Sequence, residues 1–312
     1  MPTADLFSNF NLQMLNLWVG LCRGEAGLPS DLRALGFKAK WIELEFQNSK
    51  GSAVKPELII ASDQLGHALL MEWKEGQNAD RDQLRRYADV TPGDLVQKAA
   101  LSTQEAKSAD TCLLGLDDHS PRLTISLDEA GLPFPLLSVA SDGISLAHNR
   151  FAEPNLTDIF YPKLPIKMSR IPTQLIPFDH NSETWEIAER VMPQVVRYMT
   201  DGLPRFTLDQ LAKDTVPVWD ALLSDDYQRN LKVKIQQVVH DASRHEFAQY
   251  IRRDQPAAAK RGGPTWDITY NPTSLPFDKR TREFQKLKTL QADLIEALRT
   301  NKRNPLQLSL GL

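Results

Sequence analysis

The sequence predicts an α/β fold, with a mixed sheet covered by helices on both faces, followed by a mainly helical second domain. The first observation is a set of short apolar runs of strand length, separated by helical patterns: 57–62, 67–74, 111–116 and 136–139. The second is a change of composition at 153–178, where five prolines disfavour regular helix. The third is the length of 312 residues, which exceeds the usual single core.

The amino-terminal half begins with a predicted buried helix at Asn11–Leu21 and an alternating strand at Lys40–Phe46. The next two apolar runs are separated by Asp63-Gln64-Leu65-Gly66, which begins and ends with turn residues. We therefore expect a β-hairpin with a four-residue loop. A helix at Asp80–Asp89 follows the hairpin, and the runs near 113 and 137 supply further strands.

The hairpin brings three charged residues together at its open end. Residues equidistant from the centre of the loop face each other, and Glu57 and Glu72 are such a pair. Lys74 returns to the face of Glu72, because side chains alternate along a strand. We therefore expect these three side chains to meet, whereas Asp63, a rival acid, lies at the loop tip far from Glu72.

Two neighbouring carboxylates repel each other unless a cation lies between them, and oxygen ligands favour Mg²⁺ or Mn²⁺. Lys74 could then orient a water molecule or stabilise charge on a phosphate. This arrangement indicates metal-assisted cleavage of a phosphodiester. The alternative is that the same three residues are ordinary charges at the end of a strand pair.

These residues carry a resemblance to a known family. Glu57, Glu72-Trp73-Lys74 and the Gln83–Tyr87 segment together resemble the PD-(D/E)XK nuclease superfamily. Its pattern is an acid that opens one strand, (D/E)XK at the end of the next, and often QxxxY on the following helix. The sequence departs from it at Pro56-Glu57, where the pattern has Pro-Asp. The resemblance covers about the first half of the chain and implies a restriction-endonuclease-like core at 1–152.

The resemblance also implies roles. Glu57 and Glu72 would bind Mg²⁺ or Mn²⁺, with the Trp73 carbonyl as a further ligand. Lys74 would position the attacking water or stabilise the phosphate. Gln83 and Tyr87, one helical turn apart, would support the site or touch the nucleic-acid backbone. Upstream, Glu25 lies on a predicted helix that ends near Gly36. This helix resembles the acidic first helix of the family. The implied catalytic set is Glu57, Glu72, Lys74, Gln83, Tyr87 and Glu25.

The carboxy-terminal half predicts a linker at 153–180 and a helical domain at 181–300. Ser182 is a candidate N-cap for a helix at 183–199. The segment Arg205–Ala212 resembles the start of a winged helix-turn-helix, with Thr207 capping its first helix. The later elements that we expect are two helices, a candidate wing strand and a charged last helix: 219–223, 227–250, 266–270 and 279–299.

Basic residues gather on the longer helix and on the Gly-rich loop that follows it, which suits contact with DNA phosphates. The alternative is a plain helical bundle with a solvated basic face. The candidate DNA-binding residues are Arg229, Lys232, Lys234, Arg252, Arg253, Lys260 and Arg261.

The tail at 301–312 contains a second resemblance. Gln307, Leu308, Leu310 and Leu312 match the four key positions of the hexapeptide with which bacterial replication and repair proteins dock on the sliding clamp. An apolar peptide of this kind can enter an exposed cleft of a partner. The alternative is that the tail packs on its own protein.

Composition excludes several other classes. The two cysteines, Cys22 and Cys112, form no CxxC pair, so neither a disulfide framework nor a thiolate zinc site is supported. No GxSxG elbow, Gly-rich phosphate loop, secretion signal or membrane span is present. We therefore expect a cytoplasmic protein with no membrane partner.

The leading hypothesis is a bacterial Mg²⁺-dependent DNA endonuclease in defence, mobile-element or repair processes, acting as a homodimer or with other subunits. The alternative is a non-catalytic DNA-binding or clamp adaptor protein with a decayed nuclease fold.

Overall fold

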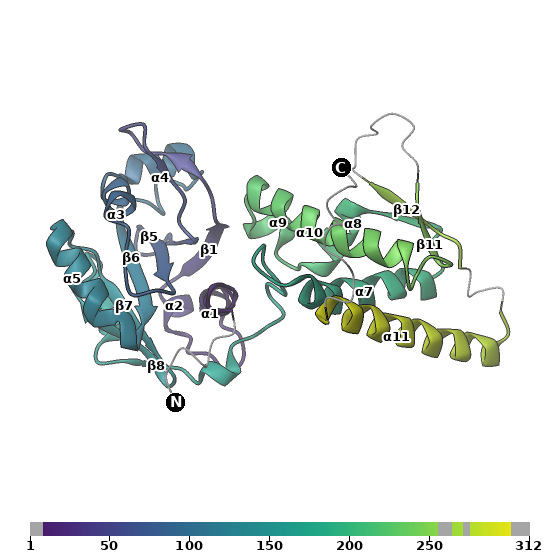
Figure 1. Ribbon diagram of the computed structural model, residues 1–312. Helices are drawn as coiled ribbons and strands as arrows, with labels where there is room; N and C mark the ends of the chain where they lie inside the picture. The colour runs from purple at the N-terminus through teal and green to yellow at the C-terminus, as the bar shows by residue number, and fades with distance from the viewer. Residues whose placement is uncertain (1–8, 255–263, 271–274, 301–312) are drawn as a thin grey trace. The chain divides into compact units, whose positions relative to one another are not determined.

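The computed structural model (Figure 1) describes residues 9–254, 264–270 and 275–300. The chain divides into two compact units, which we describe separately. The first unit comprises 1–175 together with 221–227, and the second comprises 176–220 and 228–312. The first unit therefore includes a short segment that follows part of the second unit in the chain.

The first unit contains a seven-stranded mixed sheet in the order β1-β4-β5-β6-β7-β8-β9. Strand β5 pairs in parallel with β6, and β6 with β7, whereas the other neighbours are antiparallel. This confirms the expected α/β class with a mixed sheet. The strands are β1 (Phe37–Ile42), β4 (Leu58–Ser62), β5 (His67–Lys74), β6 (Ser108–Leu116), β7 (Leu136–Ala140), β8 (Gly143–His148) and β9 (Leu164–Pro165), with β2 (Phe46–Gln47) and β3 (Ala53–Val54) forming a separate pair.

Helices cover both faces of this sheet, which in Figure 1 stands between α1 and α5. All five residues of β4 are buried, which requires apolar partners on each side. Ile59 and Ala61 join the core with Leu84 of α3 and Leu123 of α5. The helices are α1 (Phe10–Arg23), α2 (Asp31–Ala34), α3 (Arg81–Ala88), α4 (Pro92–Lys98), α5 (Ser120–Ala130) and α6 (Pro154–Phe160), with short 3₁₀ turns at Asp117–His119 and Met168–Arg170.

The predicted hairpin forms with the expected register. Ile59 pairs with Leu70 and Ala61 with Ala68 in the antiparallel ladder of β4 and β5. The loop between Ser62 and His67 is closed by a hydrogen bond from the Gly66 N–H to the Ser62 carbonyl, 2.9 Å long. Gly66 has a φ of 66°, a conformation that glycine adopts without steric cost.

Two amino-terminal predictions were wrong in their boundaries. The strand predicted at Lys40–Phe46 ends instead at Ile42, because Glu43 takes a left-handed φ of 49° and breaks the ladder. The helix predicted to carry Glu25 is interrupted. Helix α1 ends at Arg23 with Gly24 as its left-handed C-cap, so Glu25 lies in the turn that follows.

The second unit is mainly helical, as expected, and contains a small sheet in the order β10-β12-β11. Thr207 caps α8 by accepting a hydrogen bond from the Gln210 N–H, as predicted. Helix α7 is capped by Glu183 rather than by Ser182, because Glu183 and Glu186 form a capping box. Its elements are α7 (Thr184–Thr200), β10 (Arg205–Thr207), α8 (Leu208–Thr215), β11 (Ile251–Arg253), β12 (Thr265–Ile268), α11 (Phe277–Arg299) and most of α10 (Asp225–Arg244). The second half of α9 (Trp219–Leu222) and the first residues of α10 belong to the segment 221–227 of the first unit.

The segment predicted as a linker has structure of its own. It contributes α6 and β9 to the first unit, where Leu156 and Phe160 are buried. In the part of the chain that the structure describes, no helix combines the length and the apolar character needed to cross a membrane.

Candidate active site

Helix α3 is positioned by its cap and by its buried face. Asp80 Oδ1 accepts hydrogen bonds from the N–H groups of Asp82 (2.9 Å) and Gln83 (3.3 Å). These two backbone hydrogen bonds lower the pKa of Asp80, so the cap remains ionised. Leu84 and Tyr87 are buried and fix the face that α3 turns to the sheet. Gln83, one turn before Tyr87, therefore lies on the same face.

Three of the residues predicted for the site, Lys74, Gln83 and Tyr87, meet around a fourth, Glu72, which is only 3% exposed. Lys74 Nζ donates to Glu72 Oε1 at 2.7 Å and to Gln83 Oε1 at 2.7 Å. Gln83 Nε2 donates to the same Glu72 oxygen at 2.8 Å. The Tyr87 hydroxyl donates to Glu72 Oε2 at 2.9 Å. The strand end and the helix thus hold one carboxylate at both of its oxygens.

Tyr87 is a neutral hydrogen-bond donor in this network. Burial raises the pKa of its hydroxyl far above the usual value, and the charge of Glu72 raises it further. The phenol therefore keeps its proton across the physiological pH range. Its hydrogen bond fixes the rotamer of Glu72.

Glu57 is the fifth predicted residue at this end of the sheet. Its backbone N–H donates to the Met71 carbonyl at 3.0 Å, next to Glu72 in β5. Burial raises the pKa of the Glu57 carboxyl to about 8, and the charges of Glu72 and Glu43 contribute, while Lys55 and Lys74 oppose the shift. Glu57 therefore senses the charge of Glu72 and Lys74, as the hairpin register predicts.

A second acid–lysine pair lies beside Glu57, and sequence reasoning missed it. Glu43 is 3% exposed and pairs with Lys55 through its Oε2. Burial acts to lower the pKa of Lys55, but the hydrogen bond and charge of Glu43 outweigh it and raise the pKa. The pairing of β1 with β4, which the sequence alone did not predict, places the acid directly after Ile42 near the one directly before Leu58.

Glu57 and Glu72 are the residues that could hold a divalent cation, with Glu43 close to Glu57. A carboxylate offers about four lone-pair sites, so Glu72 keeps acceptor capacity beyond its three hydrogen bonds. The repulsion that raises the pKa of Glu57 is the kind that a cation relieves. Among the residues that the structure describes, no three His, Cys, Asp or Glu side chains are already grouped as metal ligands.

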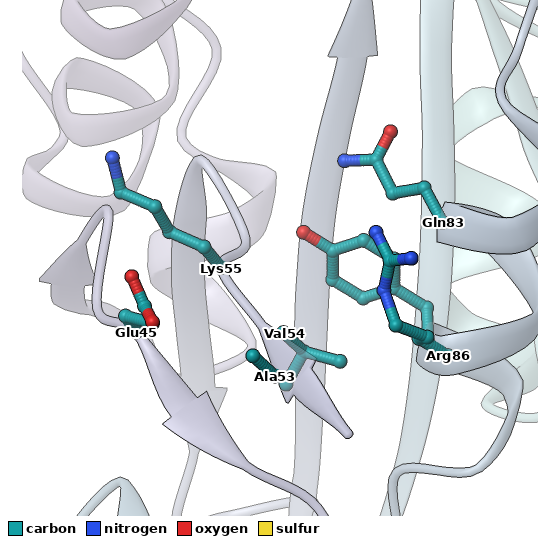
Figure 2. A pocket seen from close by; sticks show the side chains of 7 residues that line it. Glu45, Ala53, Val54, Lys55, Gln83 and Arg86 are labelled. Atoms are coloured by element: carbon teal, nitrogen blue, oxygen red, sulfur yellow. The ribbon is translucent and has the colours of Figure 1, made fainter.

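A pocket of about 180 Å³ adjoins this cluster (Figure 2). Gln83 and Arg86 line it from α3, while Ala53, Val54 and Lys55 face them from the opposite side (Figure 2). The remaining lining residues are Glu45 and Tyr87. Gln83, Lys55 and Tyr87 belong to both the pocket and the charged cluster, so the two are continuous.

Two other predicted residues lie outside this network. The side chain of Trp73 points to the opposite face of the sheet, where its Nε1 donates to Asn11 Oδ1 of α1 at 2.6 Å. Glu25 belongs to the turn after α1, in which its N–H donates to the Gly20 carbonyl and its carbonyl accepts from Leu28. That turn, and not the strand pair, determines its position.

The candidate DNA-binding residues that the structure describes lie on two elements of the second unit, α10 and β11. Lys232 is paired with Asp209 at 2.8 Å and lies 5.7 Å from the ring centroid of Trp219. Arg229 and Arg252 are exposed. The other predicted residues, Lys260, Arg261, Gln307, Leu308, Leu310 and Leu312, lie outside the described residues.

Comparison with known proteins gives one match. The family model of the MJECL32 domain matches residues 11–176, which is more than half of the chain. The matched range lies almost wholly within the first unit. No curated protein and no solved structure matches the chain.

Proposed function

The chain belongs to the MJECL32 domain family, and we propose that it is a Mg²⁺- or Mn²⁺-dependent DNA endonuclease. One observation carries the proposal: Lys74, Gln83 and Tyr87 all bind the buried carboxylate of Glu72. Glu57 lies within electrostatic range of the same group. A buried acid next to a second acid and a lysine is typical of a site where charge is handled during catalysis.

Each residue of the cluster has a role in phosphodiester hydrolysis. A bound divalent cation would polarise the phosphate and lower the pKa of an attacking water. Glu57 and Glu72 would hold that cation, and the Trp73 carbonyl is a further ligand by resemblance. Lys74 places an ammonium beside Glu72, where it would stabilise negative charge that develops on the phosphate. Gln83 and Tyr87 keep Glu72 in one orientation.

The element order of the first unit supports the proposal. Helix α1 is followed by the antiparallel strands β1, β4 and β5, then by α3 and the parallel strand β6. This order resembles the restriction-endonuclease-like core, in which the same strand ends carry the acids and the lysine.

The second unit supports a DNA-binding role. Its order is α7, β10, α8, α9, α10, β11 and β12, and β12 lies between the other two strands. This resembles a winged helix-turn-helix, with α10 in the place of the recognition helix. Arg229 and Arg252 would contact DNA phosphates there. The proposed setting is the bacterial cytoplasm, in defence, mobile-element or repair processes.

A cleavage assay on duplex, branched and single-stranded DNA with Mg²⁺ or Mn²⁺ tests this function. We expect at least one DNA form to be cut, and Glu72→Gln and Lys74→Met to lose at least about a hundredfold in rate, as for other lost transition-state contacts. Asp63→Asn, at the hairpin tip, serves as the matched control and should cut normally. A folded wild-type protein that cuts no DNA form with either metal would contradict the proposal.

A second candidate is a non-catalytic DNA-binding adaptor, as expected for a decayed nuclease fold. The observation that favours it is that both oxygens of Glu72 already accept hydrogen bonds from the protein. Glu72 is therefore ion-paired and hydrogen-bonded without a metal. This candidate predicts metal-independent DNA binding that Lys74→Met leaves unchanged, with recruitment through Gln307–Leu312. Deletion of those six residues would then abolish co-purification with the sliding clamp.

A further inference from the structure

We propose that the pocket between α3 and β3 binds a phosphate of a nucleic-acid strand next to the phosphate that reacts, with Arg86 as its main ligand. The inference deepens the proposed function and rests on it. It assigns a substrate class, a strand with charged phosphates on neighbouring nucleotides, and a residue that the sequence did not single out.

The position of Arg86 on α3 makes it the candidate phosphate ligand in this pocket. Arg86 follows Gln83 by three residues, so helical spacing places these two side chains next to each other on α3. Figure 2 shows its guanidinium on the same side of the pocket as Gln83. Arg86 therefore borders both the pocket and the cluster around Glu72.

The guanidinium of Arg86 has no partner among the residues that the structure describes. It is half-buried, and only its backbone carbonyl accepts a hydrogen bond, from Asn48 Nδ2 at 3.0 Å. Its charge helps to lower the pKa of Asp80 without an ion pair. Arg85, the preceding residue, is exposed and pairs with Asp82 at 3.7 Å. A half-buried guanidinium keeps five donors that a planar anion can fill.

The charges around Glu72 show why a phosphate needs an unpaired positively charged side chain to bind here. Glu45, which lines the pocket, and Glu43 and Glu72 beside it would repel a polyanion. The two lysines are already engaged, Lys55 with Glu43 and Lys74 with Glu72. Arg86 is the cation at this pocket that remains available to a phosphate, and Lys55 on the facing wall adds long-range attraction.

The volume of the pocket is large enough for a phosphate group. The pocket has a volume of about 180 Å³. Sites that enclose a whole organic ligand usually measure about 300–1,000 Å³. The pocket is open to solvent on one side and has room for a phosphate group of a longer strand. Arginine binds phosphate in a bidentate manner, which matches the chemistry of Arg86.

DNA affinity measured against salt concentration in EDTA tests the inference without catalysis. We expect Arg86→Gln to bind about tenfold to a hundredfold more weakly, the range for a lost charged hydrogen bond. Its log–log salt slope should fall by about one, because one phosphate contact is lost. Arg86→Lys should keep the slope but lose part of the affinity. The matched control, Arg85→Gln, should change neither quantity.

A second readout uses the wild-type protein, so it does not depend on the folding of a variant. In a titration with inorganic phosphate, the Nε–Hε resonance of Arg86 should shift and saturate, and that of Arg85 should not. Absence of that shift, or equal DNA affinities for Arg86→Gln and wild type, overturns the inference. Cleavage with Mg²⁺, measured in parallel, separates the two proposals. Phosphate binding without cleavage rejects the nuclease alone, and cleavage that is indifferent to Arg86→Gln rejects the phosphate site alone.

Discussion

At the residue scale, the hydrogen bond from Tyr87 to Glu72 links stability to the site. Tyr87→Phe keeps the buried ring but removes one donor from a buried carboxylate. We expect the free energy of unfolding in urea to fall by about 1.5–3 kcal/mol, as for hydrogen bonds to charged groups. Tyr161→Phe is the control, because Tyr161 is 71% exposed, and it should change stability by less than about 0.5 kcal/mol. Equal losses for the two variants would contradict the role of Tyr87.

The raised pKa of Glu57 predicts an unusual pH dependence for an acid. The folded carboxyl has a pKa of about 8, above the ordinary value of about 4.3 in an unfolded chain. The folded state thus holds a proton that the unfolded state has lost, and stability falls as pH rises between these values. The fall due to Glu57 is at most about 1.4 kcal/mol for each pH unit.

Urea denaturation in EDTA at pH 5 and at pH 8 measures this effect. Glu57→Gln should lose less stability between the two pH values than wild type does, because the amide does not ionise. Parallel pH profiles for the two proteins would show that Glu57 is not the group responsible.

At the scale of elements, the cap of α3 matters for the site, because this helix carries Gln83 and Tyr87. Asp80→Ala removes the acceptor of two backbone N–H groups and should lower the melting temperature. It should also slow DNA cleavage. Asp82→Ala, two residues later and paired with Arg85, should have the smaller effect on both. A larger effect from Asp82→Ala would mean that the cap does not hold the helix.

The hairpin and α3 were predictable because local chemistry determines them. Turn residues fix the loop, the period of two fixes the faces, and Asp80 marks the helix start. Glu43 was missed because its left-handed φ ends β1 inside an apparently continuous alternating run. Arg86 was missed because the sequence does not show which residues surround its guanidinium in space, and so whether it is paired. The prediction that Glu25 lies on a helix was wrong because α1 ends before it, with Gly24 as the C-cap.

At the scale of the whole molecule, a bound cation should stabilise the folded state. A ligand that binds only the folded protein adds about 2.7 kcal/mol at a concentration of one hundred times its Kd. The melting temperature should therefore rise with Mg²⁺ or Mn²⁺ and saturate. The rise should be absent in Glu72→Gln. A rise of equal size in that variant would place the cation elsewhere.

The first unit is discontinuous in sequence, which affects how it can be isolated. Ser224 Oγ donates to the carbonyl of Glu43 at 3.0 Å, and Leu223 bridges to Ile42. A fragment that stops at 175 should unfold at lower urea concentration than one that rejoins 221–227 through a short linker. Equal midpoints would show that the returning segment is dispensable.

The hydrogen bond from the Ser224 hydroxyl to the Glu43 carbonyl has an evolutionary consequence. The matched domain stops at residue 176, so the peptide that braces the strained acid comes from sequence beyond it. A protein that carries this domain alone must stabilise the left-handed backbone at the position of Glu43 with another hydrogen bond. Without one, the position of that carboxylate would change. Recombination that swaps the downstream half would therefore disturb the upstream chemistry without changing one of its side chains.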